Sequence, residues 1–170
     1  MERRTIRKWI WVWDFDKEEE WLEEMACNGW VLDGVSFGTY HFIKTEPGEY
    51  SVRLQYLPIG DESAEYTDLL EESGAQRVGR MLQWVYYRKK TCDGAFELFS
   101  DLDSRIGHLN RIANVILLIA ASNLGIGLLN TFNPSHLGWI NLLCASLLTY
   151  ALGRIHGKKE ALEKERRLRE

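Results

Sequence analysis

Residues 112–153 read IANVILLIAASNLGIGLLNTFNPSHLGWINLLCASLLTYALG, a run of 42 residues without Asp, Glu, Lys or Arg. As a single helix the run would be about 63 Å long, roughly twice the thickness of the hydrocarbon core of a bilayer. Asn133 and Pro134 favour a turn in its middle, because Pro discourages a helix from continuing through it. The sequence therefore predicts a helical hairpin that crosses a membrane twice, over about 112–129 and 137–153.

Basic residues flank this run on both sides. Arg105 and Arg111 precede it, Arg154 and Lys158 follow it, and the connecting segment has no Lys or Arg. The positive-inside rule therefore predicts a multi-pass protein of the cell membrane with both termini in the cytoplasm. A hairpin buried inside a soluble protein is the alternative, because Asn and Ser make both spans less apolar than single-span anchors.

Two charged segments adjoin the predicted spans. Ser100 and Asp103 have the spacing of a capping box, which predicts a juxtamembrane helix over 100–111. This helix either continues unbroken into the first span or ends as a spacer at Gly107. The last segment, 154–170, carries seven basic and four acidic side chains. We expect it to form a cytoplasmic basic tail, a frayed helix at the anionic inner leaflet.

Small and polar residues inside the spans suggest how the two helices pack. Ala121 and Gly125 stand four residues apart, and small residues at this spacing let membrane helices approach closely. Asn123 either hydrogen-bonds across the hairpin or only packs. No charged residue lies inside the spans, so the sequence does not indicate a transport path.

Residues 1–99 contain one pattern twice, and a shift of 45 residues superposes the two copies. The shift places Trp11 on Tyr56 and Gly29 on Gly74. Both copies predict the order strand–helix–strand–strand. The expected elements are 7–13, 16–28, 30–36 and 39–44 in the first copy, and 50–57, 64–73, 76–80 and 83–89 in the second.

The predicted fold class is α+β, with a duplicated strand–helix–strand–strand domain over 1–99 and an all-α two-span transmembrane hairpin over 112–153. The duplicated domain is similar in topology to ferredoxin-like and GyrI-like domains. We expect about six strands closed into a sandwich, with both helices on one face. Asp16, with Glu19 three residues later, is expected to cap the first helix, whose glutamates at 18–24 would face water.

Successive side chains of a strand point to opposite faces of the sheet, and this alternation gathers aromatic and cationic residues on one face. Such a face fits a ligand groove or a partner surface. The alternatives are that it packs against residues 96–99 or against a second copy of the chain. The candidate ligand or partner residues on this face are His41, Arg53, Trp84, Tyr86 and Arg88, and those of a Trp-rich interior are Trp9, Trp11, Trp13 and Trp30 together with Trp84.

Charge and motifs argue against several classes of function. Residues 1–103 carry 12 basic and 21 acidic side chains, a net charge of −9, whereas residues 104–170 have a net charge of +5. The acidic balance argues against direct binding of nucleic acid. The four histidines lie in separate segments, none has a Cys at metal-site spacing, and no Walker loop, Rossmann fingerprint or nucleophile elbow is present. We therefore expect no enzymatic activity, no metal and no cofactor.

Several blocks of the chain resemble the bacterial domain-of-unknown-function family 2812. They are Asp14–Leu22, Asn28–Trp30, Pro47–Tyr50, Trp84–Lys89 and Phe96–Asp101. The resemblance covers about residues 7–110. Members of this family often carry C-terminal membrane helices and are commonly encoded beside PadR-type transcriptional repressors. The resemblance implies a regulatory or sensing role and supplies no catalytic residues.

The expected function is that of a membrane-anchored cytoplasmic sensor or adaptor that acts with a PadR-type repressor. Its expected partners are the lipid bilayer and that repressor, with a homo-oligomer as a further candidate. An acidic face of the N-terminal domain would dock the basic DNA-binding protein and compete with DNA for it. The alternative function is the binding of a small hydrophobic or cationic ligand in an aromatic pocket.

Overall fold

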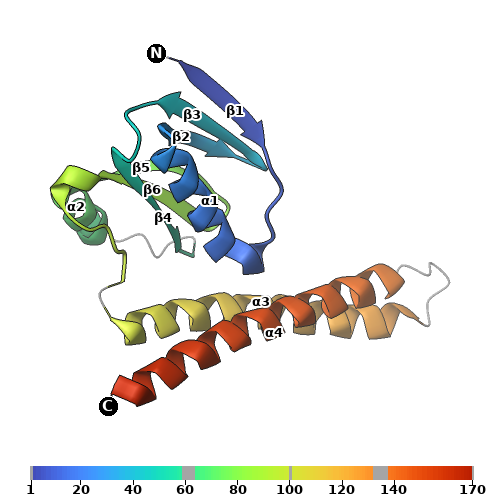
Figure 1. Cartoon of the computed structure of the whole chain (residues 1–170). Coiled ribbons are helices and arrows are strands. Elements are labelled where there is room, and N and C mark those ends of the chain that lie inside the picture. Colours follow the sequence, from blue (N-terminus) through green and yellow to red (C-terminus); the bar gives the residue numbers. More distant parts are fainter. Residues whose placement is uncertain (1, 59–63, 100, 132–137, 170) are drawn as a thin grey trace. The chain divides into compact units, whose positions relative to one another are not determined.

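The computed structural model describes residues 2–58, 64–99, 101–131 and 138–169 (Figure 1). The chain divides into two compact units, Met1–Leu98 and Phe99–Glu170. The first unit contains the six strands found in the described residues, and the second contains two long helices.

Two three-stranded antiparallel sheets build the first unit, with strand orders β1-β3-β2 and β4-β6-β5. The predicted α+β class and the duplicated order strand–helix–strand–strand are confirmed. The elements are β1 (Arg3–Arg7), the 3-10 helix η1 (Val12–Asp14), α1 (Phe15–Cys27), β2 (Trp30–Ser36), β3 (Thr39–Lys44), β4 (Tyr50–Tyr56), α2 (Ala64–Glu72), β5 (Ala75–Met81), β6 (Trp84–Lys90) and the 3-10 helix η2 (Thr91–Asp93).

The two repeats agree in local detail. α1 and α2 are each followed by a glycine with positive φ, Gly29 at 78° and Gly74 at 86°, a conformation that glycine adopts without strain. Each repeat also has one β-bulge, at Asp33 in β2 and at Val78 in β5. Both features obey the predicted shift of 45 residues.

β2 and β5, which are equivalent strands of the two repeats, lie beside each other where the two sheets meet. A Cβ added to Gly79 of β5 would lie 3.1 Å from a methyl carbon of Val35 in β2. Next to this contact, the Arg88 guanidinium of β6 donates to the carbonyl oxygen of Leu32 at 3.0 Å and to the Asp33 carboxylate at 3.3 Å. The close approach of the two strands explains the glycine at position 79.

β1 ends at Arg7, so the predicted strand over 7–13 is wrong, and so is the superposition of Trp11 on Tyr56. Arg7 pairs with Thr39, where β3 begins, and the pairing of the two strands stops there. The alternation of Trp with aliphatic residues beyond Arg7 therefore has no sheet to support it, although it has the period of a strand.

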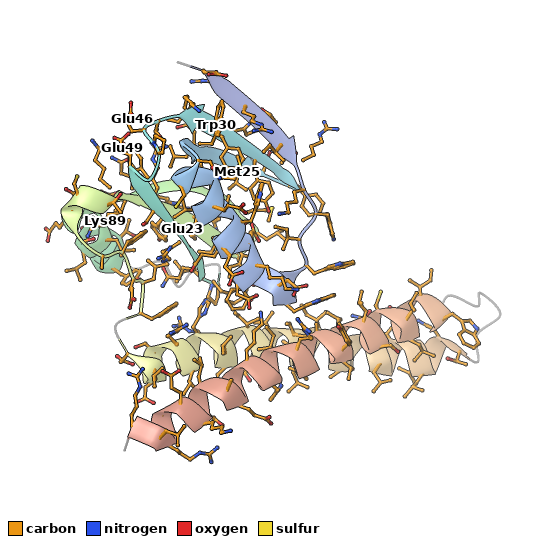
Figure 2. All side chains as sticks on the ribbon, in the orientation of Figure 1. Glu23, Met25, Trp30, Glu46, Glu49 and Lys89 are labelled. Atoms are coloured by element: carbon orange, nitrogen blue, oxygen red, sulfur yellow. The ribbon has the colours of Figure 1, made fainter. Side chains whose placement is uncertain are left out.

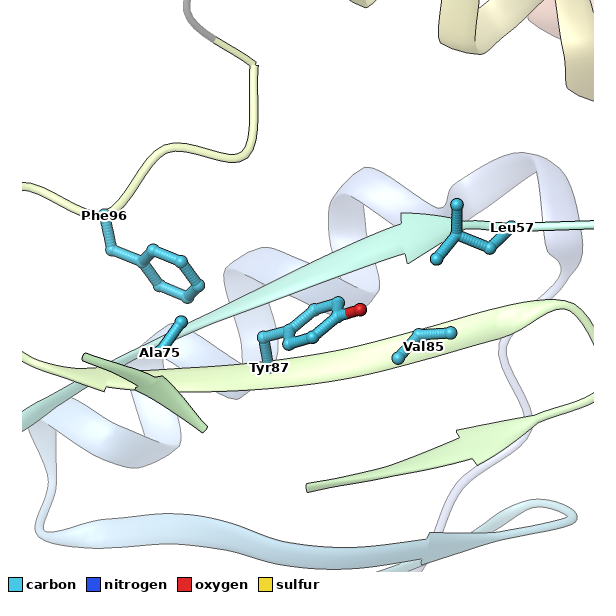
Figure 3. Packing of buried hydrophobic residues seen from close by; sticks show 5 residues of the cluster. All are labelled: Leu57, Ala75, Val85, Tyr87 and Phe96. Carbon is cyan, nitrogen blue, oxygen red and sulfur yellow. The ribbon is translucent and has the colours of Figure 1, made fainter. Parts of the chain in front are cut away.

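α1 and α2 cover opposite faces of the sheet β4-β6-β5, so the prediction of both helices on one face is wrong. On one face, the hydroxyl of Tyr86 bonds Glu18 of α1. On the other face, the neighbouring Tyr87 belongs to a buried cluster against which Leu70 of α2 packs. This cluster consists of Leu57, Ala75, Val85, Tyr87 and Phe96 (Figure 3). α1 also packs on the first sheet, where the Trp21 ring lies 5.0 Å from that of Tyr40, and it therefore serves both sheets.

The second unit consists of two long antiparallel helices, α3 (Leu102–Thr131) and α4 (Gly138–Arg169). Near one end of the pair, the Arg166 guanidinium bonds the Asp103 carboxylate at 2.6 Å. Near the other end, a Cβ added to Gly127 would lie 2.8 Å from a side chain of α4. These contacts agree with the predicted helical hairpin.

Both helices extend well beyond the uncharged run. α3 passes Gly107 without a break, so the predicted juxtamembrane helix and first span form one helix of about 45 Å. Ser100 lies outside the described residues, and the Asp101 carboxylate accepts the N–H of Ser104 at 2.6 Å near the start of α3. α4 likewise continues through the predicted basic tail as one helix of about 48 Å.

Small residues line the buried face of α3, but they are not the predicted ones. Ala113, Ala120 and Gly127 are buried and recur every seven residues, the spacing at which one helix face meets a partner helix. The predicted pair faces elsewhere, because Ala121 is exposed and a Cβ added to Gly125 would meet nothing within 4 Å.

Polar side chains of the two helices bond to their own backbone. Asn123 donates to the carbonyl oxygen of Ile119 at 2.9 Å, so its hydrogen bond does not cross the hairpin. Ser122 and Ser146 make the same bond to the carbonyl four residues earlier, at 2.9 Å each. Each of these bonds lowers the cost of placing the polar group in a bilayer, which weakens the objection that the spans are too polar.

Large apolar side chains cover the outer surfaces of both helices, with exposed fractions from 43% to 80%. They are Leu117, Leu118, Ile119, Leu124, Ile126, Leu128 and Leu129 on α3, and Trp139, Ile140, Leu143, Leu147 and Tyr150 on α4. A soluble monomer rarely exposes so large a continuous apolar surface. The described residues therefore include two helices long and apolar enough to cross a membrane.

Adding a methyl group at Gly127 is expected to weaken the helix pair. Gly127→Ala would place its Cβ 2.8 Å from Cδ2 of Leu142, and such overpacking costs about 1–3 kcal/mol. Gly125→Ala is the matched control, because its Cβ enters open space on the same helix. Thermal unfolding of both variants in the same detergent measures the difference. Equal stability would contradict the close contact between α3 and α4.

Candidate functional site

A buried carboxylate joins α1 to both sheets of the first unit. Glu18 has an exposed fraction of 6% and accepts hydrogen bonds from the hydroxyls of Tyr40 at 2.7 Å and Tyr86 at 2.6 Å. Tyr40 lies on β3 and Tyr86 on β6, and both are almost fully buried. We refer to these three residues as the Glu18 cluster.

Burial dominates the electrostatics of the Glu18 cluster. Desolvation raises the pKa of Glu18, although the hydrogen bonds from the two tyrosines and the charge of Lys8 act in the opposite direction. Desolvation and the Glu18 carboxylate also raise the pKa values of Tyr40 and Tyr86. Burial therefore disfavours the charged form of all three groups of the cluster.

Lys8 is the cation beside this cluster. Its ammonium nitrogen lies 4.0 Å from the centroid of the Trp21 ring, within the range of a cation–π interaction. Desolvation lowers the pKa of Lys8, whereas the carboxylates of Glu24 and Glu18 raise it. Carboxylate, aromatic ring and cation thus adjoin one another at the N-terminal repeat.

The other glutamates of α1 do not all face water, so that prediction is wrong. The carboxylate of Glu23, which is labelled in Figure 2, accepts the N–H of Val52 at 2.8 Å. The carboxylate of Glu19 accepts the N–H of Leu54 at 2.9 Å. Both N–H groups belong to β4, an edge strand that pairs with β6 alone among the described strands of its sheet. Arg53 of the same strand pairs with Glu23 at 3.2 Å.

The predicted capping box of α1 is also wrong. The helix begins at Phe15, Asp14 is its N-cap residue without a side-chain capping hydrogen bond, and Asp16 lies inside the first turn. Glu19 is therefore available to β4 instead of reaching back to the start of its own helix.

The pH dependence of stability should report on Glu18. The pKa of Glu18 is higher in the folded protein than in the unfolded chain, where it is near 4.5. The stabilisation that Glu18 provides is therefore fully present below this unfolded pKa and is lost as the pH rises through the folded pKa. Wild type should therefore lose stability over this window, and Glu18→Gln should not. Denaturant midpoints of the full chain in detergent, measured against pH, test this. Glu20→Gln on the exposed side of α1 is the control and should keep the wild-type profile.

The N-terminal tryptophans form a ladder that leads from the core to the surface. The ring of Trp13, which is buried, stacks on Trp11 at 4.9 Å, Trp11 contacts Trp9 at 5.8 Å, and Trp9 contacts Phe37 at 5.3 Å. The exposed fraction rises along this order from 8% to 45%, 58% and 67%. We call the exposed residues Trp9, Trp11, Val12 and Phe37 the aromatic tip.

An open depression of about 460 Å³ lies at the aromatic tip. It is lined by Arg7, Lys8, Trp9, Phe37, Gly38 and Thr39. The N–H of Lys8 donates to the carbonyl oxygen of Gly38 at 3.0 Å, which holds the segment after β1 against the turn between β2 and β3.

The remaining candidate residues lie in separate environments and do not form one face. Trp30 lies beneath the ammonium of Lys44 at 4.6 Å, and the exposed His41 bonds Thr5 at 3.0 Å. Trp84 is buried and stacks on Phe15 of α1 at 5.1 Å. Carboxylates bind the other three residues. Glu23 pairs with Arg53, Asp33 pairs with Arg88, and Glu18 accepts the hydrogen bond from Tyr86.

Sequence reasoning missed Glu18 and Tyr40. A usable signal was present, because Glu18, Leu22 and Ala26 are spaced by four residues and form the buried stripe of α1. The neighbouring glutamates concealed it, since a run of charges normally indicates a solvated helix face. Among the described residues, no group of His, Cys, Asp or Glu is arranged to hold a metal ion.

Comparison with known proteins gave one match. A family model described as "Protein of unknown function (DUF2812)" matches residues 14–121, which extend from the start of α1 into α3. No significant match to a curated protein or to a solved structure was found.

Proposed function

The chain belongs to the DUF2812 family of proteins of unknown function, and from that premise we propose that it is a membrane-anchored cytoplasmic sensor or adaptor that acts with a PadR-type transcriptional repressor. The observation that carries the proposal is the set of large apolar side chains exposed on α3 and α4, which favours a lipid environment. Only three residues separate Leu98, the end of the first unit, from the start of α3. Such a short connection suits a domain that works at the membrane.

The charge of the first unit supports a basic protein partner. Carboxylates are exposed on both of its helices: Asp16, Glu20 and Glu24 on α1, and Asp68, Glu71 and Glu72 on α2. Charged groups on a surface accelerate encounter with a partner of opposite charge and select against partners of like charge. A PadR-type repressor carries a basic DNA-binding surface, and in this proposal the acidic helices compete with DNA for it.

Co-purification tests the partner. The tagged full chain, extracted from membranes at low salt, should retain the cognate PadR-type repressor. Salt at about 1 M, where the Debye length is about 3 Å, should release it. Glu71→Lys combined with Glu72→Lys should weaken retention, whereas Lys158→Gln in α4 should not. Absence of the repressor at low salt would count heavily against this part of the proposal.

The native cysteines provide a test of orientation. Cys27 and Cys92 are exposed in the first unit. If both termini are cytoplasmic, a membrane-impermeant maleimide should label these residues only after the cells are permeabilised. A Trp139→Cys variant places a thiol at the other end of the hairpin and should be labelled in intact cells. Labelling of Cys27 in intact cells would reverse the proposed orientation.

Binding of a small organic cation is the second candidate function, and the Glu18 cluster favours it. A cation on an aromatic ring beside a carboxylate is the arrangement that recognises organic ammonium ions. Lys8 takes this place on the Trp21 ring near Glu18, and in this proposal a ligand cation displaces it. Titration with tetraphenylphosphonium should quench Trp fluorescence of wild type more strongly than that of Glu18→Gln. Equal quenching of both proteins would indicate partition into the detergent micelle and would reject this candidate.

A further inference from the structure

We propose that the aromatic tip, together with Arg7 and Lys8, docks onto the anionic leaflet of the same membrane that holds α3 and α4. The inference rests on the proposed membrane anchorage and goes beyond it, because it assigns a second, reversible membrane contact to the first unit. Its partner is a lipid surface rich in phosphatidylserine or a similar anionic lipid.

Exposure singles out the aromatic tip. Its four side chains, Trp9, Trp11, Val12 and Phe37, have exposed fractions of 58%, 45%, 40% and 67%. Elsewhere in the described part of the first unit, Leu69 and Leu82 are the other large apolar side chains exposed to this extent, and they belong to different elements. Tryptophan is the residue that proteins concentrate at membrane interfaces, because its ring is apolar and its N–H remains wet.

The aromatic tip is ordered before any contact with lipid. Trp11 stacks on the buried Trp13 with an angle of 7° between the rings, and Trp9 is held between Trp11 and Phe37. The hydrogen bond from Lys8 to Gly38 fixes the two segments that carry these rings. Little conformational entropy is therefore lost when the tip enters an interface.

Charge points to an anionic surface. The segment 3–8 carries four basic and no acidic side chains, whereas the rest of residues 1–103 carries eight basic and 21 acidic ones. An anionic leaflet would therefore attract this end of the domain and repel the remainder, which sets the orientation of docking. The depression between Arg7, Lys8 and the aromatic rings is a place for a lipid phosphate.

The short connection between the two units limits how far the first unit can move from a membrane that holds α3 and α4. The three residues between Leu98 and α3 span about 10 Å when extended, and residues 102–111 of α3 add about 15 Å before the uncharged run begins. Tethering raises the effective concentration of the first unit at the membrane surface. A contact too weak to bind a freely diffusing domain can therefore bind a tethered one.

Footprinting of the full chain tests the proposal. The protein is placed in nanodiscs of phosphatidylcholine, in nanodiscs with added phosphatidylserine, and in detergent micelles, and hydroxyl-radical oxidation of single residues is followed by mass spectrometry. One Lys or Arg near an anionic leaflet strengthens binding roughly fivefold, so oxidation of Trp9 and Phe37 should fall about threefold or more when phosphatidylserine is present. Arg7→Glu should restore the rate found in phosphatidylcholine.

The internal duplication supplies the matched control. Leu82 is the counterpart of Phe37 under the 45-residue shift, lies at the equivalent turn and is equally exposed, but it has no tryptophan ladder beside it. Its oxidation should not depend on lipid. Phe37→Asn should reduce the protection of Trp9, and Leu82→Asn should leave it unchanged.

Four outcomes would overturn the proposal. If the chain elutes with the nanodiscs but the tip is oxidised at one rate in every environment, docking fails while anchorage stands. If the chain does not elute with the nanodiscs, anchorage and docking fail together. Protection already present in micelles would assign the tip to a second copy of the chain. Equal protection of Leu82 and Phe37 would indicate general shielding by the disc.

Discussion

Glu18→Ala is expected to lower the unfolding free energy of the first unit by about 4 kcal/mol. The substitution removes the acceptor of two buried hydroxyls, Tyr40 and Tyr86, and each buried donor without a partner costs about 1–3 kcal/mol. The loss of the buried side chain also leaves a cavity between α1 and the sheets. Because whole domains are stable by only about 5–15 kcal/mol, this variant should be close to unfolding at physiological temperature. Chemical denaturation of the full chain in detergent, followed by near-ultraviolet circular dichroism, measures the effect.

Glu20→Ala is the matched control for this experiment. It removes an equally acidic side chain from the same helix at an exposed position, where substitutions usually change stability by less than about 0.5 kcal/mol. Tyr86→Phe should fall between the two, at about 1 kcal/mol, because it removes one hydrogen bond of the Glu18 cluster. Similar stabilities of Glu18→Ala and Glu20→Ala would contradict the burial of Glu18.

Leu118→Arg should impair insertion of α3 into a membrane. Leu118 has an exposed fraction of 69% and lies near the middle of the predicted first span, so the substitution would place a guanidinium in hydrocarbon. Exchange of Leu for Arg at the centre of a spanning helix costs about 3 kcal/mol on the scale of translocon-mediated insertion. Insertion into microsomes, scored by glycosylation of an added acceptor site, measures this change.

The effect of Leu118→Arg distinguishes a membrane hairpin from a water-soluble one. On a helix face exposed to water, Arg in place of Leu would be neutral or would increase solubility. Leu168→Arg is the control, because Leu168 has an exposed fraction of 78% and lies in the charged end of α4. If Leu118→Arg and Leu168→Arg insert into microsomes with equal efficiency, the apolar surface does not face lipid.

Local signals were sufficient to predict most of the first unit. β2 and β3 have the predicted bounds, because the turn at Asn28-Gly29 and the turn at Phe37-Gly38 enclose them. Gly29 and Gly38 both have positive φ, which few other residues adopt without strain. The internal repeat then gave the second set of elements, since the same turn chemistry recurs 45 residues later at Gly74.

The errors arose where a distant segment decides the outcome. The alternation of residues 9–13 has the period of a strand, but the extent of β1 is set by where β3 begins, at Thr39. The faces covered by α1 depend on its packing against the second sheet, which the pattern of either repeat alone does not contain. For the same reason the sequence did not reveal the Glu18 cluster, because its two tyrosines come from β3 and β6, on different sheets.

The matching bulges at Asp33 and Val78 lie in β2 and β5, the two equivalent strands that meet at the junction of the sheets. In an isologous interface, two identical subunits meet through the same surface patch, so equivalent strands contact each other. Two separate half-length chains of identical sequence would meet through the same pair of strands. Because both halves belong to one chain, their equivalent positions can carry different residues, and position 63, the counterpart of Glu18, is a serine. A single chain can therefore bury one carboxylate in its core, whereas a symmetric dimer would carry the same residue at both equivalent positions.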